Sequence, residues 1–190
     1  MSAHALREAV RADVPRLTEI YAHAVLNGTA SYELDPPTEA EMLARFDSLK
    51  AQGYPYLVAA NGAGRVVGYA YAGPFRTRPA YRWSVEDAIY IAPEVHGHGV
   101  GRSLLLRLIE ECTAKDFRQM VAVIGGSDHV ASIRLHERAG FRTIGIFQAS
   151  GFKFGKWIDT VLMQLQLGEG ARSLPDEAAY PGSLYTPAGS

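Results

Sequence analysis

Apolar residues along the chain follow two periods, which predict a mixture of helices and strands. Apolar positions three or four apart mark one face of a helix, and they recur between Asp13 and Gly28, between Thr38 and Gly53, over 101–115 and over 130–139. Short apolar runs bounded by turn residues are typical of strands, and they cover 5–10, 56–60, 66–72, 85–91, 120–124, 141–147 and 156–167. The predicted order is β-α-α-β-β-β-α-β-α-β-β.

Local signals support these boundaries. Asp13 is placed to cap the first helix, and Thr38 with Glu41 forms a capping box for the second. Residues 61–64 read as a hairpin turn. Hairpins in the first half and crossover helices in the second predict a mixed α/β fold, and the irregular order disfavours a doubly wound fold. We expect one domain over residues 1–167 and a flexible tail over 168–190, which holds three prolines and four glycines.

Composition limits which binding partners and which cellular compartment the protein is expected to have. The formal net charge is −1, so the chain has no basic field and nucleic acid is disfavoured as a partner. Cys112 is the single cysteine, which excludes an internal disulfide and suits the cytoplasm. The first residues lack the apolar segment of a signal peptide, and no apolar run is long enough to span a membrane.

A glycine-rich turn, His96-Gly97-His98-Gly99-Val100-Gly101, separates the strand at 85–91 from the helix at 101–115. The free N–H groups and the dipole at such a helix start favour an anion. No Lys-Ser or Lys-Thr follows as in a P-loop, and the glycine spacing differs from that of a dinucleotide fingerprint. Two readings stay open from the turn alone, an ordinary βα turn and a pyrophosphate turn of the form Arg/Gln-x-x-Gly-x-Gly/Ala.

Further stretches decide between these readings by their order along the chain. They are 69–74, 81–86, 89–91, the glycine turn, 122–125, 132–137, 140–141 and 151–159. Together they resemble the GNAT-type N-acetyltransferases, and closely the phosphinothricin/methionine sulfoximine N-acetyltransferase family. The match spans most of residues 5–167. It implies the GNAT fold, with a mostly antiparallel, splayed central sheet flanked by helices.

The resemblance also implies acetyl-CoA as the donor, a small amino-acid-like amine as the acceptor, and a homodimer. It places the pantetheine arm beside the backbone of Ile89, Tyr90 and Ile91. It places the pyrophosphate on the turn formed by Gly97, His98, Gly99, Val100, Gly101 and Arg102. Two positions depart from the family: His96 replaces the usual Arg or Gln, and His129 replaces a common cofactor-contacting Asn.

Amine acetylation needs a base for the amine and a proton for the leaving thiolate. Glu86, on the central strand just before the proposed cofactor residues, is the candidate base; the alternative is a solvated edge carboxylate. Its neighbour Asp87 is expected to point to the other face of the strand. His136 takes the position of a Tyr that protonates the thiolate in many relatives, so we expect a general acid or an orienting group. The alternative is a helix histidine that packs under the cofactor.

An amino-acid acceptor carries a carboxylate, so its pocket should present cations and flat walls. The candidates for substrate binding are Tyr32, Glu33, Arg76, Arg78, Tyr81 and Lys153, with Trp157 and Asp159 as further possibilities. The two loop arginines also fit a solvated surface, and Trp157 fits core or a subunit interface better than a substrate wall. The spacing of His96, His98, His129 and His136 is poor for metal binding, so no metal is expected.

Two rival functions stay open at this stage. One is acetylation of a protein or peptide N-terminus, which needs an open groove; the family-like loop over 74–83 argues against it. The other is a non-catalytic acyl-CoA-binding module, in which the glycine turn is kept but Glu86 and the basic loop have no role. The sequence favours an acetyl-CoA-dependent N-acetyltransferase that acts on phosphinothricin, methionine sulfoximine or methionine sulfone by direct transfer.

Overall fold

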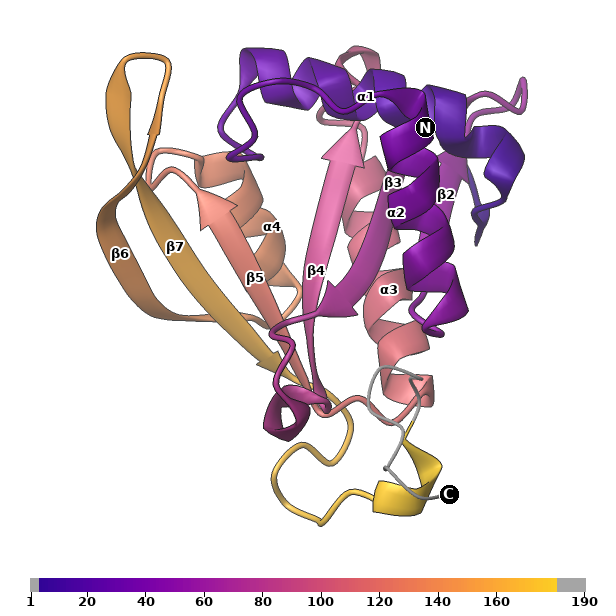
Figure 1. Cartoon of the computed structure of the whole chain (residues 1–190), viewed down its shortest axis with the longest axis vertical. Helices are drawn as coiled ribbons and strands as arrows, with labels where there is room; N and C mark the ends of the chain where they lie inside the picture. Colours follow the sequence, from indigo (N-terminus) through magenta and orange to yellow (C-terminus); the bar gives the residue numbers. More distant parts are fainter. Residues whose placement is uncertain (1–3, 181–190) are drawn as a thin grey trace.

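A seven-stranded sheet of order β1-β2-β3-β4-β5-β7-β6 forms the centre of the protein in a computed structural model that describes residues 4–180 (Figure 1). The strands are β1 (Ala5–Glu8), β2 (Tyr56–Ala60), β3 (Val66–Pro74), β4 (Ser84–Ile91), β5 (Gln119–Gly125), β6 (Arg142–Lys153) and β7 (Lys156–Gln166). The helices are α1 (Val14–Asn27), α2 (Glu39–Ala51), α3 (Val100–Ala114) and α4 (Val130–Arg138). Strands and helices follow the predicted order, and the mixed α/β fold is confirmed.

Helices cover both faces of the sheet, α1 and α2 on one side and α3 and α4 on the other (Figure 1). Because successive strand residues point to opposite faces, neighbouring residues of one strand join different cores. Tyr69 of β3 packs with α1 and α2, whereas Ala70 packs in the cluster that contains α3. Both faces of the central strands are therefore buried, so a polar side chain on either face is expected to have a hydrogen-bond partner or a function.

The predicted capping signal is present at the start of α2 but not at the start of α1. Thr38 accepts a hydrogen bond from the Glu41 N–H at 3.3 Å and donates its own N–H to the Glu41 carboxylate at 2.7 Å, so the capping box is confirmed. Asp13 stands at the N-cap position of α1, but its side chain makes no cap bond there. Its carboxylate instead accepts from Arg7 and from the Val10 N–H, which ends β1 at Glu8, two residues earlier than predicted.

The hairpin of β6 and β7 is longer than the sequence predicts, because β6 runs to Lys153 rather than to Phe147. The register shifts between Phe147 and Gly151, and Ala149 there has a positive φ of 48°. Asp159 of β7 accepts from the Ala149 N–H at 2.9 Å, so the strand continues through a bulge. The polar and glycine residues of this bulge resemble a turn in the sequence, which is why the predicted strand stops too early.

Residues 168–180 lie against the start of β4 and the loop before β5. Arg118 donates to Ser173 at 2.9 Å, Arg82 forms an ion pair with Glu177, and the rings of Trp83 and Tyr180 meet edge to face. Residues 181–190 of the predicted tail lie outside the described residues, and a flexible tail stays a prediction.

Two further observations bear on the chemistry. In residues 4–180 no helix is both long and apolar enough to cross a membrane, and no His, Cys, Asp and Glu side chains gather as a metal site would require. Cys112 is a free thiol, fully buried in α3. Burial raises the pKa of this thiol well above its usual range, which suits a small core residue rather than a nucleophile.

Candidate active site

The sheet divides between β4 and β5, and this division creates the site. The two strands are parallel and pair only at Ser84 with Gln119, Val85 with Met120 and Glu86 with Val121. Beyond Glu86 the strands diverge (Figure 1). A cleft of about 820 Å³ opens there, lined by β4, β5, the start of α3 and the inner side of α4. The splayed sheet expected from the sequence is present.

Strand pairing decides which backbone groups of β4 face this cleft. The Ala92 N–H donates to Val67 of the β3 side, and the Phe75 N–H donates to Ser84. Because backbone groups alternate along an antiparallel pair, Tyr90 turns its N–H and C=O toward β3. Ile89 and Ile91 turn theirs toward the cleft. Tyr90 lines the cleft by position, but its backbone is already used by the sheet.

The glycine turn leads directly into α3 with an open end. Gly97 and Gly99 both have φ of 80°, and a Cβ at either position would meet nothing within 4 Å. Glycine is required here by the backbone conformation rather than by space. The first N–H groups of α3, from Val100 onward, have no carbonyl of an earlier helical turn to bond. The cleft therefore receives a set of backbone donors and the positive end of the helix dipole.

The two histidines of the turn bond to the backbone. His96 Nε2 donates to the Ile91 carbonyl at 3.0 Å, and His98 Nδ1 donates to the His96 carbonyl at 3.0 Å. His96 thus ties the turn to the end of β4 and occupies one of the backbone acceptors that faces the cleft. His98 does not line the cleft, and its own N–H donates to Val95.

Glu86 lies at the point where β4 and β5 separate, and it lines the cleft. Burial raises the pKa of this carboxyl to about 7, the nearby Asp87 adds to the rise, and Arg76 opposes it. Within the described residues Glu86 has no ion-pair partner in contact. A carboxyl group with a pKa near neutrality takes up and releases protons readily at physiological pH.

Asp87 points to the opposite face of β4, as predicted, and binds α4. His136 Nε2 lies 3.0 Å from Asp87 Oδ2, and His136 Nδ1 lies 2.8 Å from the Ser132 carbonyl. A carbonyl only accepts, so Nδ1 carries a proton, and Nε2 donates to Asp87 when the ring is charged. Burial lowers the pKa of His136, but the hydrogen bond to Asp87, the charge of Asp87 and the hydrogen bond to Ser132 together outweigh burial and raise this pKa. Both ring nitrogens therefore have a partner, Nδ1 the Ser132 carbonyl and Nε2 the Asp87 carboxylate.

His129 occupies the N-cap of α4 and lines the cleft. Its Nδ1 is buried and has no hydrogen-bond partner among the described residues. Burial lowers the pKa of His129, the charge of Asp128 opposes this, and His136 adds to the lowering. His129 therefore lines the cleft and carries one buried ring nitrogen that no described residue satisfies.

Residues 29–32 form a strap that closes the cleft from the α1 side. Thr29 donates to the Gly125 carbonyl at 2.6 Å, and Tyr32 donates to the Asp159 carbonyl at 3.0 Å. Lys153 is 3% exposed and donates to the Ser31 carbonyl at 2.8 Å. Burial lowers the pKa of Lys153, although Glu33 opposes this. The strap is therefore pinned to the β6–β7 hairpin.

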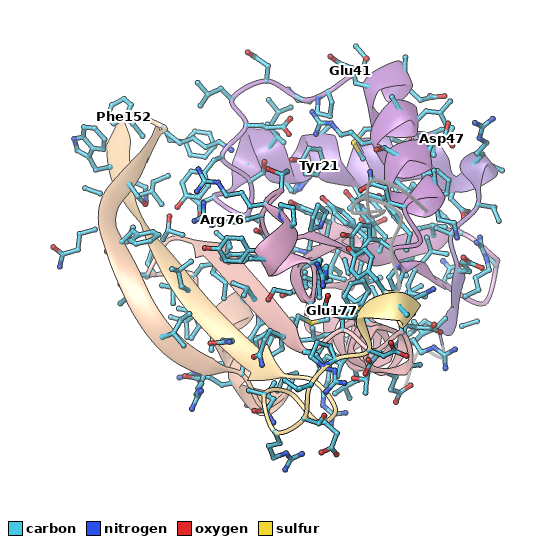
Figure 2. All side chains as sticks on the ribbon, turned by 60° about the horizontal axis from the view of Figure 1, so that its bottom comes forward. Tyr21, Glu41, Asp47, Arg76, Phe152 and Glu177 are labelled. Atoms are coloured by element: carbon cyan, nitrogen blue, oxygen red, sulfur yellow. The ribbon has the colours of Figure 1, made fainter. Side chains whose placement is uncertain are left out.

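The remaining predicted substrate residues lie around the rim. Glu33 accepts from Arg45 at 2.6 Å and from the Tyr21 hydroxyl at 3.0 Å. Arg76 lies beside the Phe75 ring and near enough to Glu86 to lower its pKa. Arg78 and Tyr81 are exposed in the loop before β4. Figure 2 shows Arg76 and Tyr21 on the body of the protein and Phe152 at the outer tip of the hairpin.

The cleft collects most of the predicted catalytic and cofactor residues and few of the predicted substrate residues. Those that line it are Tyr32, Glu86, Ile89, Tyr90, Ile91, Gly97, Gly99, Val100, Gly101, Arg102, His129 and His136. Those that do not are Glu33, Arg76, Arg78, Tyr81, His98 and Lys153. The sequence reasoning missed Ser31, Arg134 and Arg138, which also line it. The four-residue spacing of the two arginines on one helix was the available signal.

Comparison with known proteins agrees with this geometry. The model of the acetyltransferase (GNAT) family matches residues 17–141 of the chain. The chain belongs to the GNAT acetyltransferase family. It is 50% identical over 164 residues to the phosphinothricin N-acetyltransferase of Alcaligenes faecalis, a match that covers 86% of this chain and 83% of the relative.

Two further relatives extend the agreement. The L-methionine sulfoximine/L-methionine sulfone acetyltransferase of Pseudomonas paraeruginosa is 43% identical over 175 residues, which cover 92% of this chain and 100% of the relative. A GNAT phosphinothricin acetyltransferase from Sinorhizobium meliloti, solved in complex with acetyl-CoA, superposes with a TM-score of 0.94. That structure is 52% identical, with 98% of this chain and 100% of the other chain covered. The fold and the acetyltransferase activity of this GNAT enzyme are thereby established.

Proposed function

We propose that this GNAT enzyme transfers the acetyl group of acetyl-CoA directly to the α-amine of a small amino-acid analogue. Phosphinothricin, methionine sulfoximine and methionine sulfone are the candidate acceptors, in keeping with the names of its relatives. The observation that carries the proposal is the position of Glu86. This unpaired carboxyl lies where β4 and β5 separate, in the same cleft as the open start of α3.

The proposed chemistry divides the cleft into three parts. The amides at the start of α3 and the turn, together with Arg102, hold the pyrophosphate, while the Ile89 and Ile91 backbone groups hold the pantetheine arm and the thioester oxygen. Glu86 removes a proton from the ammonium group of the acceptor, directly or through a water. The neutral amine attacks the thioester carbonyl, the C–S bond breaks as the carbonyl re-forms, and the thiolate takes up the proton that the new amide nitrogen releases as CoA leaves.

His136 is better suited to orienting than to donating a proton. Its Nδ1 is held by Ser132 and its Nε2 by Asp87, so neither nitrogen is free to approach the thiolate without breaking a buried bond. We therefore assign His136 the orienting role among the two expected for it. Tyr32 encloses the acceptor in the cleft, with Glu33 and Lys153 supporting the strap behind Tyr32.

The test is release of free CoA thiol when the protein is incubated with acetyl-CoA and each candidate amine. Turnover with one of the three amino-acid analogues and none with a peptide bearing a free N-terminus supports the proposal. Preferential turnover of the peptide overturns the acceptor class. Binding of acetyl-CoA without turnover of any amine in a broad panel leaves a non-catalytic acyl-CoA-binding module instead.

We also propose a homodimer formed through the β6–β7 hairpin. Six large apolar side chains there are between 50% and 68% exposed: Ile144, Ile146, Phe147, Phe152, Phe154 and Trp157. Such a concentration on one arm exceeds what scattered surface residues explain. Trp157→Glu should shift the protein from dimer to monomer in sedimentation experiments, whereas Leu26→Glu, at a 57% exposed position on α1, should not. A monomeric wild-type protein at micromolar concentration contradicts the dimer.

A cytoplasmic location belongs to the same proposal. The only cysteine of the chain is a buried free thiol, so folding requires no oxidising compartment. Fractionation of cells that express the protein at its natural level, with detection in the soluble cytoplasmic fraction, tests the assignment.

A further inference from the structure

Three arginines line the cleft from α3 and α4. Arg102 lies in the first turn of α3, and Arg134 and Arg138 lie on α4. All three are exposed. None of them forms an ion pair with any residue in the described part of the chain. Their charges are available to a ligand.

Several other surface arginines of the protein are neutralised by carboxylates. Arg11 pairs with Asp47, Arg45 pairs with Glu33, and Arg107 pairs with Glu111 at 2.7 Å on the same helix as Arg102. Lack of a partner does not by itself define a site, because Arg142 at the start of β6 also forms no ion pair within residues 4–180. The three cleft arginines differ because they converge on one cavity.

The carboxylates of the cleft do not cancel these charges. Glu86 and Asp87 are the acidic residues in its lining. Asp87 is bound by His136, and Glu86 points to the opposite face of β4 from Asp87. The end of the cleft between α3 and α4 is therefore positively charged, and it is suited to an anion.

Arg134 and Arg138 are four residues apart, so they lie one above the other on α4, with Cβ atoms about 6 Å apart. Two guanidinium groups at that spacing suit a single phosphate monoester. The glycine turn and Arg102 supply the donors for a diphosphate, which leaves the α4 pair for a separate phosphate. Acetyl-CoA, the donor in the proposed function on which this inference rests, carries one on its ribose.

We propose that Arg134 and Arg138 form a subsite for the ribose 3′-phosphate of CoA, distinct from the pyrophosphate turn. The enzyme then discriminates CoA from dephospho-CoA, which lacks only that phosphate. The subsite adds a second phosphate contact on α4 to a turn in which His96 stands where the family has Arg or Gln.

The experiment measures the dissociation constants of CoA and dephospho-CoA by calorimetry on the full chain. Wild-type protein should bind CoA about 10- to 100-fold more tightly, the range expected for charge-assisted hydrogen bonds. In the Arg134→Gln/Arg138→Gln variant this ratio should fall to about 1–3, with little change in the affinity for dephospho-CoA. Both side chains are exposed, so the variant should keep the wild-type melting temperature.

Two variants separate this subsite from its alternatives. Arg142→Gln, an exposed and unpaired arginine outside the cleft, should keep the wild-type ratio. Arg102→Gln should weaken both ligands alike. Equal wild-type affinities, an unchanged ratio in the double variant, or loss of discrimination in Arg102→Gln alone would overturn the proposal.

The outcome is independent of acetyl transfer. Acetylation of an amino-acid analogue without discrimination between the two ligands removes the subsite and leaves the proposed function standing. Discrimination that depends on the α4 pair, without turnover of any amine, supports the subsite and removes the proposed reaction.

Discussion

Glu86 and Asp87 are adjacent carboxylates on one strand, yet the protein uses them in opposite ways. Glu86 lies on the α1 and α2 side, faces no ion-pair partner in contact, and has a pKa raised to about 7 by burial first and Asp87 second. Asp87 is 8% exposed and bound to His136. Burial without a partner makes a carboxyl group a base, whereas burial with a partner makes it a structural link.

The difference follows from the pleat of β4. Side chains alternate across a strand, so one residue meets the open cleft and the next meets α4. Asp87 thereby joins β4 to a helix that otherwise contacts mainly β5 and α3. Consecutive residues of β4 therefore have different tasks: Glu86 is the proposed base, and Asp87 holds α4, which bounds the cleft.

The largest expected effect is on catalysis by Glu86. Glu86→Gln should lower kcat by about 10²- to 10⁴-fold, the usual contribution of a general base, while the affinity for acetyl-CoA changes little. Steady-state kinetics combined with calorimetry checks this. Glu94→Gln, at an exposed residue before the turn, is the control. Unchanged kcat in Glu86→Gln would show that this carboxyl is not the base.

The second effect is on stability through Asp87. Asp87→Asn leaves the His136 imidazolium without its counter-ion and should lower the free energy of unfolding by about 3 kcal/mol near pH 6. The pKa of His136 is raised in the folded state, so the pair stabilises fully below the unfolded value near 6.5 and less as pH rises through the folded value. The loss should therefore shrink at pH 9.

Urea unfolding at both pH values measures this effect. Asp47→Asn, which breaks the exposed pair with Arg11, should cost far less stability than Asp87→Asn, because solvent screens an exposed ion pair. Comparable losses in the two variants, or a loss in Asp87→Asn that does not depend on pH, would mean that the buried pair is not charged.

The third effect is a gain in stability, whereas the second is a loss. Glu86 has a pKa raised from 4.5 to about 7, so its stability contribution is lost as pH rises between those values, when the buried group must ionise. Glu86→Gln should therefore raise the free energy of unfolding by about 1–2 kcal/mol at pH 8, after allowance for partial exposure. Between pH 4 and 8 the melting temperature should therefore change less with pH in the variant than in the wild-type protein. An inactive variant that is also destabilised at pH 8 would contradict the comparison.

The smallest expected effect is on the pKa of Glu86 and so on the pH dependence of kcat/KM. The kcat/KM of the wild-type enzyme should rise with pH to a plateau above about 7, because Glu86 acts when ionised. Arg76 lowers the pKa of Glu86, so Arg76→Gln should move this limb to higher pH by less than about one unit. Arg78→Gln, two residues away in the same loop, should leave the limb in place. Equal movement in both variants would indicate a general charge effect.

More of the residues predicted for catalysis and for the cofactor line the cleft than of those predicted for the substrate. Glu86 and the glycine turn follow each other within one strand–turn–helix unit, so local periodicity places them correctly. Lys153 and Glu33 were expected to contact the substrate from their charge, and they instead bond to Ser31 and Arg45. Charge indicates that a residue needs a polar partner, but it does not indicate which one.

The sequence by itself determined the order of the strands and helices, the opposed directions of Glu86 and Asp87, and the open start of α3. These depend on side-chain periodicity and on glycine backbone freedom, which act over a few residues. The tertiary structure alone decided that His136 meets Asp87 across 49 residues of chain, and that Ile89 and Ile91 rather than Tyr90 turn their backbone groups toward the cleft, where His96 takes the Ile91 carbonyl. Strand register and helix packing set those contacts, and both arise only when distant segments come together.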